Sequence, residues 1–305
     1  MNITILYGGT STEHKISIQT GLAIAEAIKD RYNLDMINLD GKIYNAPHLL
    51  LDTDLVINAL HGGDGENGSI QSFLDLHHIP YTGSGAKACK IAMDKNITKL
   101  IAKSVGIPTP NWVLLKRNVN NGMQLQDNDS PKFSYPYVVK PADEGSTFGL
   151  TIVNEESELN DAISLAAEFS DEILIEEFIP GKELTVSILG NKPLPIIEII
   201  PSHKLYDYDC KYTEGMSEYV VPADLSDSIE RSLSEDALKI YKTIGCRHYA
   251  RADFRLNDEG QHYLLEINTL PGMTSTSLLP KAAKAAGLEF PELIDTIIKI
   301  ASLNN

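Results

Sequence analysis

Residues 250–273 constrain the fold more than any other stretch of this 305-residue sequence. They predict a strand, a turn, a second strand and a Pro-Gly loop. Side chains alternate between the faces of a strand, so Arg251 and Asp253 share one face of the first strand. Glu266 and Asn268 likewise share one face of the second. Carboxylate and amide oxygens are the ligands that Mg²⁺ takes when it also holds phosphates, so a metal site is one interpretation of this hairpin.

The other interpretation is an edge hairpin whose charged face is simply solvated. A loop of small residues at 269–277, which could admit a ligand, counts against it. The apolar residues between the charged positions also predict a well-packed hairpin; they are Phe254, Leu256, Leu264, Leu265 and Ile267. The residues alone leave both interpretations open.

The register of the hairpin decides which side chains meet. A two-residue loop at 259–260 places Asp253 opposite Glu266. A type I turn with Gly260 in a bulge places Ala252 opposite Glu266 instead. The Asn at the first turn position and the Gly at the fourth suit the second register. Turn chemistry by itself does not decide between the two registers.

The composition of the chain argues against several classes of partner. A formal net charge of −16 disfavours nucleic acids and anionic membranes, because both need a basic surface. The three cysteines, Cys89, Cys210 and Cys246, lack the spacing of a zinc site or a disulfide framework, which fits a reducing cytoplasm. The sequence shows no signal peptide and no run of the roughly 20 apolar residues that span a bilayer. We therefore expect a cytoplasmic protein with neither a nucleic-acid nor a membrane partner.

Alternating strands and helices predict a parallel sheet in the first part of the chain. Strands are expected at 3–7, 34–39 and 55–60, with a helix at 17–29. Ligands bind such sheets beyond the carboxyl ends of the strands, where the Gly-rich loops 8–14 and 61–69 lie. Two such loops at one sheet edge indicate a shared pocket. The first loop lacks the spacing of a dinucleotide fingerprint, so NAD is disfavoured.

The remainder of the chain mixes helices, strands and polar loops. A helix is expected at 87–105, with a domain boundary near residue 95, and the polar stretch 117–134 predicts a surface loop or a poorly ordered link. The small-residue loop 141–149 is either a loop that closes over phosphates or an ordinary flexible hairpin. The length of the aromatic-rich stretch 205–219 indicates a functional loop or lid. Further strands are expected at 150–153, 173–179, 184–189 and 194–200, and helices at 155–169, 226–243 and from about 277 and 291.

Seven motifs occur in order along the whole chain. They are Gly-Gly-Thr-Ser-Thr-Glu-His-Lys-Ile-Ser (8–17), His-Gly-x-x-Gly-Glu-x-Gly (61–68), Tyr-Thr-Gly-Ser-Gly (81–85), Met-Asp-Lys (93–95), Val-Lys-Pro-Ala-x-Glu-Gly-Ser (139–146), Tyr-Asp-Tyr-Asp-Cys-Lys-Tyr (206–212) and Glu-Ile-Asn-Thr-Leu-Pro-Gly-Met-Thr-x-x-Ser (266–277). In this order they resemble the D-alanine–D-alanine ligases of the ATP-grasp superfamily. The resemblance implies an α/β protein that is α+β in its ATP-grasp part. An N-terminal parallel-sheet domain at 1–94 would be followed by two ATP-grasp subdomains at 95–180 and 181–305.

The resemblance implies that ATP phosphorylates the carboxylate of one D-alanine and that the amine of a second attacks the acyl phosphate. ADP, phosphate and D-alanyl-D-alanine, a peptidoglycan precursor, would be released. Two Mg²⁺ or Mn²⁺ ions would be held by Asp253, Glu266 and Asn268. That set favours the register with Asp253 opposite Glu266 and Gly260 simply closing the turn. The residues implied to bind ATP are Lys95, Lys140, Ser146, Glu176, Glu177, Ile179, Glu183 and Lys211.

The resemblance also implies two amino-acid subsites. Glu13 would hold the ammonium of the first D-alanine, with His61 bracing the pocket beside it. Ser277 and the N–H of Leu278, at the start of a helix, would bind the carboxylate of the second. The implied substrate-binding set is Glu13, His61, Arg251, Gly272, Ser277 and Leu278.

The implied catalytic groups surround the reacting carbon. Arg251 and the N–H of Gly272 would stabilise the tetrahedral intermediate. Ser146 and Tyr212 would bond with Glu13 and pin two loops over the site, which excludes water. The implied catalytic set is Glu13, Ser146, Tyr212, Arg251, Gly272 and Ser277.

Two positions depart from the family pattern. Asn67 stands where an Asp is usual, which would alter packing beneath Glu13. Glu177 stands where a Lys is common, which removes a positive charge near the nucleotide and would weaken ATP binding. Two alternatives therefore stay beside the dipeptide ligase: a ligase of another amino acid, and a nucleotide-binding regulatory protein without catalysis. The resemblance further implies a homodimer.

Overall fold

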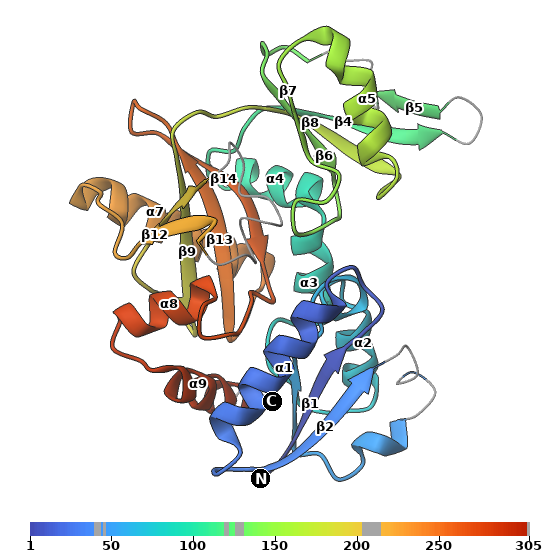
Figure 1. The fold of residues 1–305 in the computed structure, drawn as a ribbon, viewed down its shortest axis with the longest axis vertical. Helices are drawn as coiled ribbons and strands as arrows, with labels where there is room; N and C mark the ends of the chain where they lie inside the picture. The colour runs from blue at the N-terminus through green and yellow to red at the C-terminus, as the bar shows by residue number, and fades with distance from the viewer. Residues whose placement is uncertain (40–43, 45–46, 119–121, 126–130, 203–214, 304–305) are drawn as a thin grey trace.

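The described residues of the chain form three sheets (Figure 1). The computed structural model describes residues 1–39, 44, 47–118, 122–125, 131–202 and 215–303. A parallel N-terminal sheet lies at one end of the molecule, an antiparallel central sheet lies at the other, and an antiparallel C-terminal sheet lies between them. The expected parallel-sheet part followed by an α+β part is therefore confirmed.

The N-terminal sheet has the strand order β2-β1-β3, with all pairs parallel. β3 is buried at all four of its positions, as expected for a parallel strand covered on both faces. The elements of this part are β1 (Asn2–Gly8), α1 (His14–Ile28), β2 (Asn33–Leu39), the 3₁₀ helices η2 (Pro47–Leu50) and η3 (Gly63–Gly65), β3 (Leu55–Asn58), α2 (Ser69–Leu76) and α3 (Ala86–Met93).

The single helix expected at 87–105 is wrong. The chain forms two helices there, α3 and α4 (Lys95–Ser104), which are separated by Asp94 in an extended conformation. The Asp94 carboxylate accepts a hydrogen bond from the N–H of Ile97 at 2.9 Å, so it caps α4. An Asp inside a helical pattern is a known cap signal, and here it orients Lys95 at the first position of the new helix.

The central sheet has the strand order β5-β4-β8-β6-β7 and is antiparallel throughout. Residues 117–134, expected to be a surface loop, instead begin with the end of β4 and include β5. Their polar sequence suits an edge hairpin, because strand pairing rather than apolar packing holds an outer strand. The elements are β4 (Trp112–Asn118), β5 (Gly122–Leu125), β6 (Tyr137–Pro141), β7 (Thr151–Val153), α5 (Glu156–Ala166) and β8 (Glu172–Glu177).

The C-terminal sheet has the strand order β12-β11-β9-β13-β14, and β10 pairs with β9. The predicted loop 205–219 ends in a strand, because residues 217–219 belong to β12 and pair with β11; residues 205–214 lie outside the described part of the chain. The elements are β9 (Lys182–Leu189), β10 (Lys192–Pro193), β11 (Ile197–Pro201), β12 (Ser217–Val220), α7 (Asp227–Ile244), β13 (Tyr249–Leu256), β14 (His262–Asn268), α8 (Leu278–Ala285) and α9 (Phe290–Leu303).

The first and last parts of the chain share a hydrophobic core. Ile24 and Ile28 of α1 pack in one cluster with Ile294 and Ile297 of α9, and Figure 1 shows these two helices side by side. Burial of this apolar surface fixes the N-terminal sheet against the C-terminal sheet. In the described residues, no helix combines the length and the apolar character that crossing a bilayer requires.

Candidate active site

The β13–β14 hairpin brings the predicted metal ligands together. Asp253 pairs directly with Glu266, and Arg251 pairs with Asn268. The predicted register of Asp253 and Glu266 is therefore confirmed. Since paired residues of an antiparallel ladder project to the same face, the two carboxylates lie on one side of the sheet.

The turn itself follows the other register. The N–H of Asn257 donates to the carbonyl of Gln261 at 3.0 Å, and Gly260 has φ +76°, so the turn is a three-residue turn with a left-handed glycine. The expectation that a two-residue turn sets the site is wrong. The register instead shifts by one residue between Asp253 and Phe254, where β14 carries an extra residue.

This β-bulge at Leu265 re-aligns the strands so that the carboxylates meet. Leu265 and Glu266 both line the same cavity, although consecutive residues of a regular strand face opposite ways. Leu265 is half-buried, whereas the other four apolar residues of the hairpin are buried, as expected for a well-packed hairpin. A single extra residue therefore pairs Asp253 with Glu266 and also turns Leu265 into the wall of the cavity.

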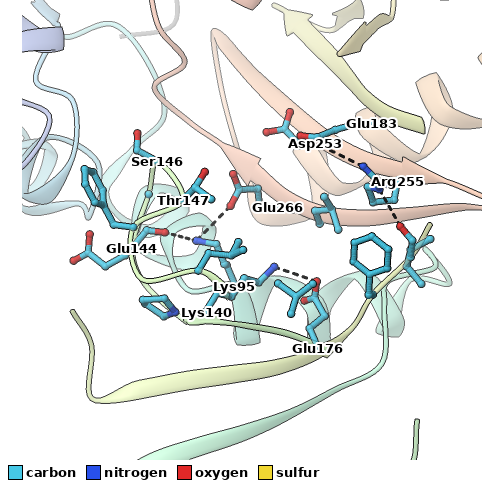
Figure 2. A pocket seen from close by; sticks show the side chains of 18 of the residues that line it. Lys95, Lys140, Glu144, Ser146, Thr147, Glu176, Glu183, Asp253, Arg255 and Glu266 are labelled. Carbon is cyan, nitrogen blue, oxygen red and sulfur yellow. Dashed lines mark hydrogen bonds and ion pairs between the residues drawn. The ribbon is translucent and has the colours of Figure 1, made fainter. Parts of the chain in front are cut away.

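A cleft lies between the central sheet and the C-terminal sheet (Figure 2). The space between the two walls measures about 1040 Å³, and part of it is open to solvent. Most of the residues predicted to bind ATP line this cleft: Lys95, Lys140, Ser146, Glu176, Glu177, Ile179 and Glu183. Lys211 lies outside the described residues.

Helix α4 presents two lysines, one turn apart, to the two walls of the cleft. Lys95 Nζ lies 3.3 Å from Glu266 Oε2 and donates to the carbonyl of Glu144 at 2.5 Å. Lys99 Nζ lies 2.7 Å from Glu176 Oε2 and donates to the Thr109 hydroxyl at 2.8 Å. The helix therefore links the carboxylate of β14 to the carboxylate of β8.

Glu176 is the centre of a buried charge cluster. Lys140 Nζ lies 3.1 Å from its Oε1, so each carboxylate oxygen has its own lysine. Burial alone would raise the pKa of the Glu176 carboxyl, but the charges of Lys140 and Lys99 outweigh burial and hold it below its usual range. Burial lowers the pKa of the Lys99 ammonium to about 8, against the attraction of Glu176. Glu176 is therefore an ionised acceptor inside a largely apolar wall.

Sequence reasoning missed Lys99. The helical spacing of Lys95 and Lys99, four residues apart, was the available signal, because such residues share one helix face. Sequence reasoning also missed Thr185, whose hydroxyl donates to Asp253 Oδ1 at 2.6 Å from the neighbouring strand β9. No local pattern points to Thr185, because strand pairing alone brings it there.

The donor set at the hairpin suits a divalent cation shared with phosphates. Arg251 pairs with Asp253 through two bonds, from Nε at 2.9 Å and from Nη2 at 2.8 Å. Lys95 lies beside Glu266, so each of the two carboxylates has a cation next to it. The described residues contain no group of three or more His, Cys, Asp or Glu side chains placed to hold a metal. Two carboxylates and the Asn268 amide therefore fit Mg²⁺ or Mn²⁺ only together with oxygens from a ligand.

A second pocket adjoins the cleft at the edge of the N-terminal sheet. Glu13 lies in its wall with 8 % of the residue exposed, and the Ser146 hydroxyl donates to its Oε1. Ser146 and Thr147 have φ of +48° and +65°, which is strained for residues with a Cβ. Because Ser146 is held by Glu13 and the preceding carbonyl of Glu144 by Lys95, the loop keeps this conformation. Tyr212 lies outside the described residues.

The far side of this pocket is built by the loop before α8. A Cβ on Gly272 would lie 2.8 Å from Ser277 Oγ, so a larger residue there would displace the Ser277 hydroxyl. Ser277 is the N-cap of α8, and its hydroxyl accepts from the N–H of Thr274 at 3.2 Å. Gly272, Ser277 and Leu278 all line the pocket, as predicted for the second amino-acid subsite.

His61, Asn67 and Glu177 each have a polar partner nearby; the last two are the positions that depart from the family pattern. His61 Nε2 lies 2.9 Å from the Thr20 hydroxyl, and His61 lines the second pocket. The Asn67 side chain accepts from the N–H of Ser69 at 3.0 Å and so braces the start of α2. The Glu177 carboxylate accepts from the Asn111 side chain at 2.8 Å.

Two antiparallel sheets that enclose a cleft of lysines and carboxylates define an ATP-grasp enzyme. Two family models match the chain: the one described as D-ala D-ala ligase N-terminus matches residues 41–84, and the one described as D-ala D-ala ligase C-terminus matches residues 101–299. The chain belongs to the D-alanine–D-alanine ligase family.

Relatives match the chain from end to end. The D-alanine–D-alanine ligase of Syntrophotalea carbinolica is 43% identical over 302 residues, which cover 99% of this chain and 96% of the relative. The crystal structure of the D-alanine–D-alanine ligase from Bacillus anthracis complexed with ATP is 35% identical with a TM-score of 0.86, covering 99% of this chain and 97% of that one. The VanG D-Ala:D-Ser ligase from Enterococcus faecalis is 30% identical with a TM-score of 0.82, covering 98% and 99%.

Proposed function

We propose that this protein uses ATP to join two D-alanines into D-alanyl-D-alanine through an acyl phosphate, as a cytoplasmic homodimer that supplies peptidoglycan synthesis. One observation carries the proposal: the nucleotide cleft and the second pocket share a wall. The shared residues are Gly145, Ser146, Arg251 and Glu266. A terminal phosphate in the cleft and a carboxylate in the pocket would meet at this wall, which is the arrangement that phosphoryl transfer to a carboxylate requires.

The cleft would hold ATP by charge and by hydrogen bonding. Lys95 and Lys140 would bind the phosphates, with Lys95 exchanging its Glu144 carbonyl for a phosphate oxygen. The ionised carboxylate of Glu176 would accept from the adenine amine, and Glu183 would accept from the ribose hydroxyls. Ser146, Glu177, Ile179 and Lys211 complete the proposed nucleotide set.

Asp253, Glu266 and Asn268 would hold the two Mg²⁺ or Mn²⁺ ions. Bound there, the ions supply positive charge that offsets the charge of the phosphate being transferred. Arg251 would keep its paired contact with Asp253, and its remaining N–H donors would face the reacting carboxylate.

The second pocket would hold the two amino acids. Glu13 would bind the ammonium of the first D-alanine, and Ser277 with the N–H of Leu278 would bind the carboxylate of the second at the start of α8. Arg251 and the Gly272 N–H would stabilise the oxyanion of the tetrahedral intermediate. The Ser146–Glu13 bond would keep the loop closed over the acyl phosphate and exclude water, with Tyr212 completing the closure.

The three parts of the chain would divide this work. In our proposal, residues 1–94 bind the first D-alanine, residues 95–180 cover the nucleotide, and residues 181–305 carry the metal and catalytic groups. The structural likeness to a D-Ala:D-Ser ligase favours one second candidate, a ligase that takes a different second amino acid. Asn67 gives that candidate little support, because its side chain braces α2.

A panel assay tests the proposed function. The protein is incubated with ATP, Mg²⁺ and either D-alanine alone or D-alanine paired with other D- and L-amino acids, and ADP release and dipeptide are measured. We expect both products with D-alanine alone. Absence of both would contradict the proposal, whereas faster turnover with D-alanine plus D-serine would favour the second candidate. ATP binding without turnover on any amino acid would indicate a regulatory protein.

Gly272→Ala is expected to weaken D-alanine binding selectively. The new Cβ would meet Ser277 Oγ at 2.8 Å and displace the residue proposed to bind the second D-alanine. Displacement of the Ser277 side chain should raise the KM for D-alanine about tenfold and leave the KM for ATP within about twofold. Gly85→Ala is the matched control, because its Cβ would lie 3.7 Å from the nearest atom. An unchanged KM for D-alanine in Gly272→Ala would contradict this assignment.

A further inference from the structure

Arg255 occupies the wall of the nucleotide cleft with three donors engaged (Figure 2). Its Nε donates to the carbonyl of Ile179 at 3.0 Å and its Nη2 to the carbonyl of Gly181 at 2.8 Å. Its Nη1 lies 3.4 Å from Glu183 Oε2. Arg255 on β13 pairs directly with Glu183 on β9, so strand register places the two side chains on one face.

The carbonyls that Arg255 holds belong to a crossover between the two walls of the cleft. Residues 178–181 connect the end of β8 in the central sheet to the start of β9 in the C-terminal sheet. A Cβ on Gly181, which has φ +115°, would lie 2.1 Å from the carbonyl oxygen of Leu256, so the crossover packs directly against β13. The guanidinium carbon of Arg255 also lies 5.8 Å from the centre of the Phe178 ring. Arg255 therefore fastens the crossover to β13 along its length.

Arg255 also brings a positive charge to a stretch rich in carboxylates. Glu176 has Lys99 and Lys140 as partners, and Glu177 accepts from the Asn111 side chain. Among the described residues, Arg255 places a cation 3.4 Å from the Glu183 carboxylate. A nucleotide is itself polyanionic, so a carboxylate in its site needs a fixed cation beside it to stay oriented rather than repelled.

We propose that Arg255 is a positioning residue for nucleotide recognition: it orients Glu183 toward the ribose and holds the crossover whose Phe178 and Ile179 line the cleft. The proposal rests on the proposed function only in assigning this cleft to ATP. A lysine would not replace Arg255, because a single ammonium cannot donate in a fixed plane to two carbonyls and a carboxylate at once.

The test compares two nucleotides whose difference is the ribose. Binding of ATP and of 2′,3′-dideoxy-ATP to the whole protein is measured by calorimetry with Mg²⁺ and without any amino acid. The wild-type protein is expected to prefer ATP about tenfold, the value of one good hydrogen bond to a charged group. In Arg255→Met the ATP affinity falls about tenfold and the dideoxy affinity falls by less than about threefold, so the preference falls below about threefold.

Four further variants make the outcome specific. Glu183→Gln should lose the preference to the same degree, and the Arg255→Met/Glu183→Gln pair should lose no more than either alone. Arg255→Lys should give an intermediate preference, and it keeps the test available if Arg255→Met folds poorly. Lys182→Met is the matched control, since Lys182 adjoins Glu183 on β9 but pairs with Glu198 at 2.8 Å outside the cleft.

Two outcomes would overturn the role of Arg255. One is an unchanged preference for ATP in folded Arg255→Met and Arg255→Lys. The other is an equal loss of affinity for both nucleotides, which would mark Arg255 as a structural residue only. Neither outcome depends on dipeptide formation, so a failure of the proposed ligase activity would be recognised separately in the amino-acid panel.

Discussion

Glu266→Gln is expected to lower kcat at least about a hundredfold while the protein stays folded. The change keeps the shape of the side chain but removes one of the two carboxylates that pair across the β13–β14 hairpin. An amide oxygen binds Mg²⁺ much more weakly than a carboxylate does, so the charge on the transferred phosphate would be poorly offset. Steady-state ADP release at saturating ATP, D-alanine and Mg²⁺ measures the loss.

The control for this variant lies in the same hairpin. Glu259→Gln makes the identical chemical change in the exposed turn and should leave kcat within about twofold. Thermal unfolding of both variants reports whether the fold is intact. Near-normal turnover by a well-folded Glu266→Gln protein would remove Glu266 from the metal set.

Arg251→Met should lower kcat by about a hundredfold to a thousandfold, the usual effect of losing one donor to a developing oxyanion. In the unmodified protein, the two hydrogen bonds from Arg251 to Asp253 hold the guanidinium in a fixed plane at the wall shared by the cleft and the pocket. Arg251→Lys should also lose at least about tenfold, because an ammonium cannot form the same paired contact. The kcat for dipeptide formation and the ATP affinity by calorimetry are measured together.

ATP affinity separates catalysis from binding in the Arg251 variants. We expect it to change less than about tenfold, because Lys95 and Lys140 remain in the cleft. Arg231→Met, on the exposed side of α7, is the matched arginine control. A collapse of ATP affinity that accounts for all of the lost turnover would contradict an oxyanion role for Arg251.

Much of the fold was predictable because the relevant signals are local. Apolar runs that alternate with amphipathic stretches predicted the parallel sheet, and the Gly-rich loops were placed correctly at its edge. The errors have local causes as well. Asp94 ends α3 by capping α4, which a continuous helical pattern hides. Residues 122–125, inside a stretch rich in polar residues, form strand β5 because an outer strand is held by pairing with its neighbour.

The alternation of residues along two strands was sufficient, without any structure, to place Arg251 with Asp253 and Glu266 with Asn268 on common faces. Only the tertiary structure decided how those faces meet, since the turn sets one register and the bulge at Leu265 sets the other. The tertiary structure also decided the buried charge cluster around Glu176 and the contacts of Arg255. Periodicity is a property of neighbouring residues, whereas register, burial and charge pairing depend on which distant strands the folded chain brings together.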